Sequence, residues 1–426
     1  MGVIKAAARK LVGEKIYHHL ASIKSKIKIL LVLGRRKLWS RPNFMLDAAV
    51  SMEIFDEPSA EIFFGYYDLV PFSRDERRML AMRKSLGTAS RTSEIDISVG
   101  YFNLGEREPR FIEIGKTKTW CWQQGCRLQW FPGKSESMVL YNRQVNGAHG
   151  AVLQNIETMD VERTYPRPIY SLSADGRAGL SLNFVRLQRL RPGYGYDDLP
   201  DETDGESRPE NDGIWSIDMK SGESALLFSV AEIARMDPRP TMDNAEHYFN
   251  HILWNPDSTR FMFFHLWMRE GKRYIRLITA NRDGSDPYVL YNEDHVSHYW
   301  WLSQDEIVAF STHAKSGSHY HLYKDKKGCV GIVGASVLDR DGHPSFRPGS
   351  QVMLTDSYPD GRFERGLMLY DTETLELKKL GKFYSPPFLS GEHRCDLHPR
   401  WSPSGKMVCV DSAHRGNRSM CVLNFN

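Results

Sequence analysis

Short hydrophobic runs recur along the whole chain, and their length predicts β-strands. The runs at 260–264 and 406–410 are two examples, both rich in aromatic, β-branched or other apolar residues. Turn pairs such as Asp283-Gly284 and Ser404-Gly405 lie between such runs, and these residues tolerate the backbone of tight hairpins. Each repeat also has one aromatic or aliphatic anchor that precedes a turn and then a run. The seven anchors are Phe72, Trp130, Leu172, Trp254, Trp301, Phe346 and Trp401.

The anchors recur with a period of about 40–50 residues, which is typical of β-propellers. We therefore predict an all-β fold, a seven-bladed β-propeller, with an insertion in the long interval between Leu172 and Trp254. The propeller is expected to span residues 44–426. Only three strands are evident in the last repeat, so residues 44–56, and within them Ala49–Phe55, are predicted to supply the strand that closes the ring.

Residues 1–43 differ in composition from the rest of the chain. They hold eleven Lys and Arg residues but one acid, Glu14, and apolar residues are interleaved at helical spacing from Val3 to Leu33. This pattern predicts a basic amphipathic helix that contacts an anionic membrane surface or an acidic polymer. The alternative is a solvated or packed extension.

The apolar run Ile27–Leu33 is interrupted by Lys28 and is too short to span a bilayer. No secretory signal is recognisable. We therefore expect a cytoplasmic protein that contacts the inner face of the membrane. Nucleic acid is not an expected partner, because the net charge is only +3 and most of the basic excess lies in residues 1–43.

Four histidines occupy the same place in four repeats, each three residues before an anchor. They are His251, His298, His343 and His398. Because the first strand of each propeller blade lines the central channel, we expect them to converge there, with His393 and Asp396 beside the last of them. Imidazole and carboxylate groups suit Zn²⁺ or Mn²⁺. The alternative is a set of histidines that only hydrogen-bond neighbouring blades.

A second group of polar residues comes from the first half of the chain. Arginine binds carboxylates in a bidentate manner, and tyrosine can stack on sugars and transfer protons. The residues concerned are Gln124, Arg127, Arg143, His149, Arg186, Arg189, Arg191, Tyr194 and Tyr196. The last five lie around a Pro-Gly turn at the start of the insertion, which indicates a shaped loop.

These motifs resemble those of known propellers. The segment His398–Lys406, followed by Val410-Asp-Ser, resembles the last blades of TolB-like propellers. His298-Tyr-Trp-Trp and the set His393, Asp396 and His398 resemble the metal-site blades of oligogalacturonate lyases. The loop 189–196 and the segment 123–126 are similar to those of propeller lyases that act on ulvan. One departure is that Gln-x-x-His-x-His of the oligogalacturonate lyases is here His393-x-x-Asp396-x-His398.

The resemblance implies β-elimination at a uronate of an oligo- or polysaccharide, assisted by a divalent metal, Mn²⁺ or Zn²⁺. It implies that Arg186, Arg127 or Arg191 neutralises the carboxylate, that His149 is the base, that Tyr194 or Tyr196 is the acid, and that His251 is a second proton-transfer residue. Further implied substrate-binding residues are Gln124, Arg143, Arg189 and Asn250. The implied metal ligands are His298, His343, His393, Asp396 and His398.

Other functions remain open from the sequence. The chain is also compatible with a non-catalytic propeller scaffold or a glycan-binding protein of polysaccharide biosynthesis, because a fold does not determine activity. A glycoside hydrolase would need two facing carboxylates about 5–10 Å apart. The evident acids near the predicted rim are Asp68, Glu392 and Asp396, and the sequence does not pair them.

Overall fold

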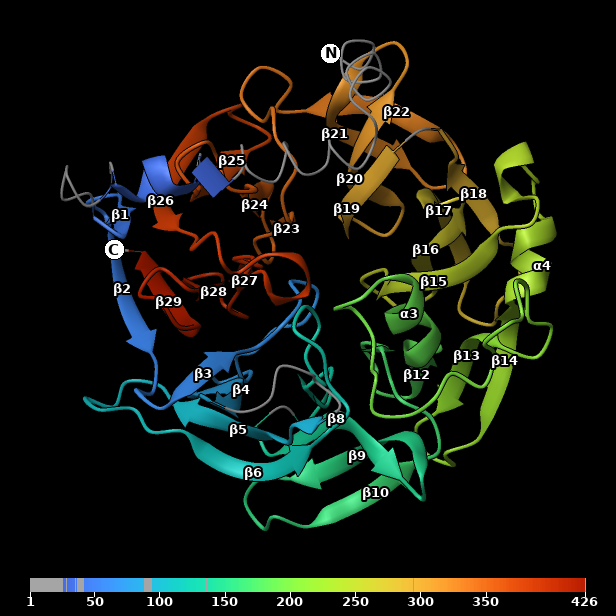
Figure 1. The fold of residues 1–426 in the computed structure, drawn as a ribbon, viewed down its shortest axis with the longest axis horizontal. Helices are drawn as coiled ribbons and strands as arrows, with labels where there is room; N and C mark the ends of the chain where they lie inside the picture. The colour runs from blue at the N-terminus through green and yellow to red at the C-terminus, as the bar shows by residue number, and fades with distance from the viewer. Residues whose placement is uncertain are drawn as a thin grey trace.

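The computed structural model shows antiparallel four-stranded sheets arranged radially around a central axis (Figure 1). It describes residues 26–27, 29–34, 36, 42–87, 94–134, 136–293 and 295–425. Over this part of the chain there are seven sheets, one of which has a fifth strand. The predicted seven-bladed β-propeller is thus confirmed.

The first three blades follow one another in sequence. Their strands are, in blade one, β3 (Ala60–Phe63), β4 (Arg78–Ser85), β5 (Ile97–Asn103) and β6 (Ile112–Thr117); in blade two, β7 (Gln129–Trp130), β8 (Met138–Val145), β9 (Ala148–Asn155) and β10 (Val161–Tyr165); and in blade three, β11 (Ser171–Leu172), β12 (Ala178–Ser181), β13 (Gly213–Asp218) and β14 (Ser224–Ser229). The insertion between β12 and β13 contains helix α3 (Phe184–Leu190).

Blades four to seven complete the ring. Their strands are, in blade four, β15 (Glu246–Trp254), β16 (Arg260–Arg269), β17 (Lys272–Asn281) and β18 (Tyr288–Tyr291); in blade five, β19 (His295–Trp301), β20 (Glu306–His313), β21 (Gly317–Lys324) and β22 (Gly328–Val333); in blade six, β23 (Ser345–Phe346), β24 (Val352–Asp356), β25 (Glu364–Asp371), β26 (Leu377–Tyr384) and β1 (Phe44–Leu46); and in blade seven, β27 (Arg400–Trp401), β28 (Met407–Ser412), β29 (Ser419–Phe425) and β2 (Val50–Phe55). Short helices are α4 (Val230–Arg235), η2 (Pro240–Met242) and η3 (Gly391–His393).

The ring is closed by a strand from the N-terminal part of the chain. β2 pairs antiparallel with β29 along its whole length, from Val50 opposite Phe425 to Phe55 opposite Met420. β1 does not belong to this blade, because it pairs with β26 as the outermost strand of blade six. The prediction that the closing segment spans residues 44–56 is therefore wrong for its first part. Residues 47–49 separate β1, which belongs to blade six, from β2, which closes blade seven.

The core lies between neighbouring blades. In blade three, Phe228 contacts Phe261 and Phe263 of blade four, with ring centroids 6.4 and 6.0 Å apart. Aromatic rings of this size fill the wedge between two sheets that diverge from the axis. The described helices include none that is both long enough and apolar enough to cross a membrane. Most of the helix predicted over Val3–Leu33 lies outside the described residues.

A pair of buried histidines is built into blade four. Arg276 donates from Nε to Nδ1 of His265 over 2.9 Å, so Nε2 of His265 carries the proton shared with Nδ1 of His247, 2.8 Å away. His247 then donates from Nε2 to the carbonyl oxygen of Met242 at 3.3 Å. While both rings are neutral, each of their four nitrogens takes part in one hydrogen bond. Burial lowers the pKa of His247 to about 4 and that of His265 well below 6.5.

We expect this pair to make the fold sensitive to acid. In the unfolded chain both rings take up protons near pH 6.5, whereas in the folded protein His247 stays neutral down to about pH 4 and the pKa of His265 is also well below 6.5. The stabilisation is thus complete above pH 6.5 and decreases as the pH falls, by up to about 1.4 kcal/mol per pH unit for each ring. Urea unfolding between pH 7 and 5 measures this slope. The slope is expected to be shallower in the variant H247Q/H265Q and unchanged in H295Q, whose side chain is exposed; equal slopes in all three proteins would contradict the assignment.

Candidate functional site

Four histidines from four blades converge at the axis of the ring. They are His251, His298, His343 and His398, all nearly fully buried. The pairing register of β15 shifts around His251, and that of β19 shifts around His298. His251 and His398 also have left-handed backbones, with φ of 52° and 43°. Such irregularities re-aim a side chain out of the regular strand alternation, here toward the axis.

The ring of Tyr66 is the common contact of these histidines. Its centroid lies 5.0 Å from that of His251, 6.5 Å from His298, 6.2 Å from His343 and 4.9 Å from His398. Tyr66 follows Gly65, where a β-carbon would come within 2.9 Å of the backbone of the neighbouring blade, so only glycine fits. The channel at this level is therefore filled by side chains.

Hydrogen bonds fix the tautomer of three of the histidines. Nδ1 of His343 lies 2.8 Å from a carboxylate oxygen of Asp356, and Nδ1 of His398 lies 2.7 Å from the carbonyl oxygen of Gly65. Nδ1 of His298 similarly lies 3.0 Å from Asp341. These oxygens accept, so Nδ1 carries the proton and Nε2 keeps its lone pair. Histidines that bind metals are commonly oriented in this way.

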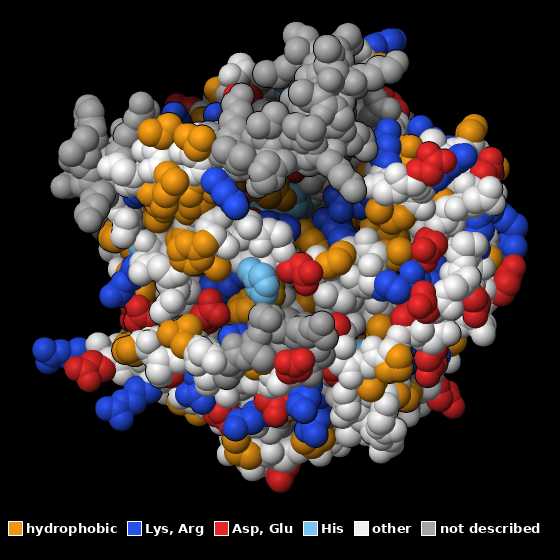
Figure 2. Space-filling view, viewed as in Figure 1, with side chains coloured by type: hydrophobic (Ala, Val, Ile, Leu, Met, Phe, Trp, Pro, Cys, Tyr) orange, Lys and Arg blue, Asp and Glu red, His pale blue; other side chains and the backbone are white. Residues whose placement is uncertain are grey.

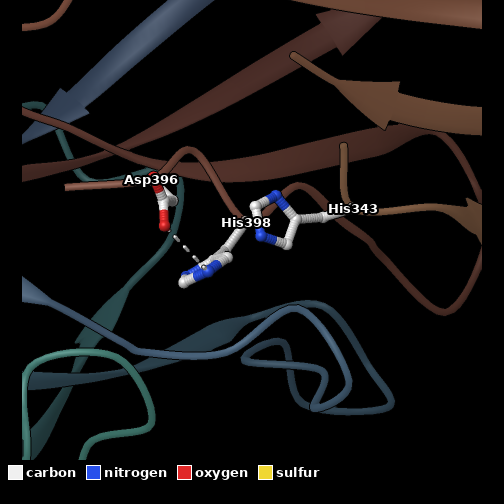
Figure 3. Close-up of side chains that lie close together, drawn as sticks. All are labelled: His343, Asp396 and His398. Atoms are coloured by element: carbon white, nitrogen blue, oxygen red, sulfur yellow. Dashed lines mark ion pairs between the residues drawn. The ribbon is translucent and has the colours of Figure 1, made fainter. Parts of the chain in front are cut away.

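Three residues can hold a cation together. His343, Asp396 and His398 each offer a ligand atom, and the three atoms lie within 4.8 Å of one another (Figure 3). Among the described residues, Nε2 of His343 and Nε2 of His398 have no hydrogen-bond partner. Leaving buried polar atoms unpaired costs about 1–3 kcal/mol each, which favours a ligand at this position. The donor set, two imidazoles and a carboxylate, fits Mn²⁺ or Zn²⁺.

Two of the five predicted metal ligands lie outside this group. The centroid of the His298 ring is only 4.1 Å from that of His343. His298 has, however, no nitrogen within 4.8 Å of the ligand atoms of all three residues. His393 is exposed and packs edge-on against Trp122, 5.7 Å away. It lies in η3, which precedes β27, and it is not part of the group that Asp396 and His398 form with His343.

A layer of arginine and tyrosine borders the metal-binding group. The carboxylate of Asp396 forms ion pairs with Arg365 at 2.7 Å and Arg394 at 2.6 Å, and these charges hold its pKa well below 3.8 although burial would raise it. Arg394 also donates to the hydroxyl of Tyr194. The guanidinium of Arg191 lies over the ring of Tyr194, 3.9 Å from the centroid.

The charges of this layer also act on Tyr194. Burial alone would raise its pKa, but the charges of Arg191 and Arg394 outweigh burial and lower it below 10. Its ring contacts Tyr66 edge-on at 6.2 Å, which places it next to the histidines. A tyrosine whose pKa is lowered inside a cationic site ionises at a lower pH than an ordinary tyrosine and is suited to proton transfer.

His251 and a neighbouring amide pair also carry unpaired polar atoms. His251 is stacked on Tyr299 with centroids 4.2 Å apart, and neither ring nitrogen has a hydrogen-bond partner among the described residues. Burial lowers its pKa well below 6.5, so it is neutral. Gln124 donates to Asn250 at 2.9 Å, while the other amide atom of each is unpaired within the described part of the chain. These atoms remain able to bind a ligand or a water molecule.

Arg127 is not available to a substrate. It occupies in blade two the place of the histidines in other blades, and its backbone is likewise left-handed with φ of 55°. Its side chain is fully buried and forms a bidentate ion pair with Asp68, with both N–O distances 2.9 Å. The remaining nitrogen, Nε, donates to the carbonyl of Tyr170. The expectation of substrate binding is thus replaced by a structural role.

His149 and Tyr196 lie apart from the histidine group. Nε2 of His149 is 2.7 Å from Asp198, and the ring of His149 contacts that of Tyr196 edge-on at 5.4 Å. His149 lines a cavity of about 640 Å³ next to the insertion, together with residues such as Asn183 and Trp215. Tyr196 is buried, stacks on Phe184 and accepts a hydrogen bond from Asn142. The ring contacts and hydrogen bonds described for these two residues do not involve His343, Asp396 or His398, so His149 as base and Tyr196 as acid lose their geometric support.

The other predicted arginines hold the insertion or face solvent. Arg186 is buried and uses all three nitrogens to bind backbone oxygens of His247, Thr203, Glu206 and Ser207. Arg189 forms ion pairs with Asp201 at 2.8 Å and Glu246 at 2.6 Å. Arg143 is exposed on β8. Of the arginines expected to neutralise a carboxylate, only Arg191 therefore borders the site.

Several residues of the site were not predicted from the sequence. Tyr66 belongs to the run Phe63-Phe-Gly-Tyr-Tyr-Asp68, whose density of aromatic residues directly after a strand was an available signal. Arg394 adjoins the predicted set His393, Asp396 and His398. Arg365 gave no signal, because it lies on β25, the third strand of blade six from the axis, and reaches Asp396 only through the fold.

Neither a protein-family model nor a curated protein sequence matches this chain. The fold is similar to several solved structures. An oligogalacturonate lyase from Vibrio parahaemolyticus is 14% identical, with a TM-score of 0.59 over 90% of this chain and 98% of that one. An oligogalacturonate lyase in complex with manganese is 13% identical, with a TM-score of 0.61 over 91% and 98%. The propeller domain of the Trilobed protease from Pyrococcus furiosus is 13% identical, with a TM-score of 0.50 over 87% and 95%. Because a lyase and a protease share it, this likeness shows the fold alone.

Proposed function

We propose that this propeller is a polysaccharide lyase that cleaves uronate-containing glycans by β-elimination, the reaction class of the oligogalacturonate lyases with the same fold. The observation that carries the proposal is Tyr194, whose pKa is lowered by Arg191 and Arg394 beside a buried group of potential metal ligands. A cationic site that contains a hydroxyl of lowered pKa matches the needs of proton abstraction next to a carboxylate.

Arg191 and Tyr194 have different roles in this reaction. Arg191 binds and neutralises the uronate carboxylate, since its side chain has no hydrogen bond or ion pair among the described residues and lies against Tyr194. The ionised Tyr194 oxygen takes the C5 proton. The electrons of the C5–H bond form the C4=C5 double bond, the C4–O bond breaks, and Tyr194 returns the proton to the leaving oxygen. Neutralising the carboxylate makes the largest contribution to lowering the activation barrier, because the C5 proton is otherwise weakly acidic.

Other residues prepare the site. A divalent cation held by His343, Asp396 and His398 would withdraw charge from the carboxylate. Asp356 and the carbonyl of Gly65 hold the two imidazoles in the tautomer that presents Nε2. His251 is retained as the second proton-transfer candidate, since its neutral ring has unpaired nitrogens.

The test is the appearance of the conjugated-enoate absorbance band when purified protein is incubated with a panel of uronate-containing oligosaccharides. A rise in absorbance that depends on Arg191 supports the proposal. Saccharide binding in calorimetry without any rise in absorbance would instead indicate a glycan-binding propeller. If neither binding nor a rise in absorbance is detected, the proposal is wrong and a non-catalytic scaffold is indicated.

Metal removal gives a separate prediction. Chelation, or the substitution H398A, is expected to slow enoate formation at least about tenfold, because disturbing such a site typically costs 10–100-fold. Metal analysis by mass spectrometry should show bound Mn or Zn in the untreated protein and much less in H398A. The matched control is H393A, which removes an exposed imidazole outside the group; a metal content that falls equally in both variants would contradict the assigned ligands.

A further inference from the structure

We infer that the outer edge of blade six, together with the N-terminal helical segment, docks on an anionic lipid surface. This inference does not depend on the proposed lyase activity. Residues 29–34 are helical, and in Figure 1 the coloured pieces of this segment lie beside β25 and β26.

One arginine fastens the segment to the propeller. Arg36 is buried, and its Nη1 lies 3.0 Å from a carboxylate oxygen of Glu364 on β25. Its guanidinium also lies 3.9 Å from the ring centroid of Tyr384 on β26, and Nη2 donates to the carbonyl of Pro42 over 2.8 Å. The segment that precedes Arg36 is therefore positioned relative to blade six.

The segment exposes apolar side chains. Residues 29–33 are Ile-Leu-Leu-Val-Leu, and Leu30 and Leu31 are 68% and 58% exposed. On the same blade, Phe44 and Met45 of β1 are 39% and 57% exposed. Figure 2 shows hydrophobic side chains gathered over β1, β25 and β26. Grouped exposed apolar residues of this kind mark a surface that binds another apolar phase.

Charge identifies that phase as anionic lipid. Residues 1–43 carry eleven Lys and Arg but one acid, while the whole chain has a net charge of only +3, so the remaining residues together are net negative. The basic excess is thus confined to the segment that carries the exposed leucines. An anionic bilayer offers negative headgroups beside an apolar interior and satisfies both features. A nucleic acid or an acidic protein surface would leave the leucines exposed.

The test is co-sedimentation of the full chain with two kinds of vesicle. One kind is pure phosphatidylcholine, and in the other a third of the lipid is phosphatidylglycerol. We expect binding to the anionic vesicles only, and release at high salt because salt screens the basic residues. The variant L30D/L31D should bind about 100-fold more weakly, since each buried leucine contributes roughly a factor of ten or more.

The matched control is L375D. Leu375 is also 68% exposed, but it lies at the turn between β25 and β26, the opposite end of this hairpin from Glu364. Equal binding to both vesicles, no binding, or equal losses in L375D and L30D/L31D would each overturn the inference. So would a dimer in light scattering that L30D/L31D abolishes without any vesicle binding, because the surface would then serve a second copy. The enoate assay without lipid should be unchanged in L30D/L31D, which separates this inference from the lyase proposal.

Discussion

Replacing Tyr194 by phenylalanine is expected to lower the rate of enoate formation about 10²–10⁴-fold, the usual loss when a proton-transfer group is removed. The substitution deletes one oxygen and keeps the ring that contacts Tyr66 and Arg191. Substrate affinity should therefore change much less than the rate. Initial rates of absorbance increase, measured over a range of substrate concentrations, give kcat and KM separately.

The pH dependence provides a second measurement on the same residue. Because Arg191 and Arg394 overcome burial and lower the pKa of Tyr194, the ionised form is reached at a lower pH than for an ordinary tyrosine. The rate should rise with pH up to this pKa, and the residual rate of Y194F should lack that rise. Y196F serves as the control, since Tyr196 lies in the other cluster with His149. A greater loss in Y196F than in Y194F would move the reaction to the cavity beside the insertion.

Substitution of Arg127 by methionine is expected to decrease the free energy of unfolding by about 3–5 kcal/mol, because it leaves the buried carboxylate of Asp68 without its partner. Both side chains are almost inaccessible, so water cannot replace the guanidinium. The double variant D68N/R127M removes both charges and should recover part of the loss. Denaturant unfolding of the two variants and the unmodified protein measures the difference.

The same variants distinguish structure from catalysis at this position. If Arg127 only supports the fold, D68N/R127M should retain most of its enoate-forming rate at a temperature where it is folded. A loss as large as that of Y194F in a folded D68N/R127M would restore Arg127 to the substrate-binding residues. An R127M variant as stable as the unmodified protein would contradict the assigned ion pair.

The fold was readable from the sequence because the propeller repeats its pattern. Strand runs, turn pairs and anchors such as Trp254 and Trp401 recur at one spacing, and each copy supports the others. The position of the repeat also indicated where the histidines lie. What repetition could not show was the boundary between β1 and β2, since both are short strands in one segment and their partners, β26 and β29, are set by long-range pairing.

The candidate site was predicted only in part, for a physical reason. His343 and His398 lie at repeat positions and Asp396 lies two residues before His398, so their convergence follows from the ring. For the arginines, residue type alone does not say whether a guanidinium faces a ligand or binds the protein itself. Arg186 lies in helix α3 and Arg191 caps the C-terminus of the same helix, yet only the first guanidinium is held by backbone oxygens. That difference depends on where the insertion folds back, which no local pattern records.

The closing strand has a consequence for how the chain is made. Val50 is synthesised before blades one to five, but its partner Phe425 belongs to β29, which is the last strand of the ring in chain order. While the ribosome works through the intervening blades, both edges of the unfinished ring remain unpaired, and such edges invite association with other nascent chains. Pairing between two strands so far apart in the sequence also makes closure of the ring slow. We therefore expect the yield of folded protein to depend on translation temperature and chaperone supply more than its equilibrium stability would suggest.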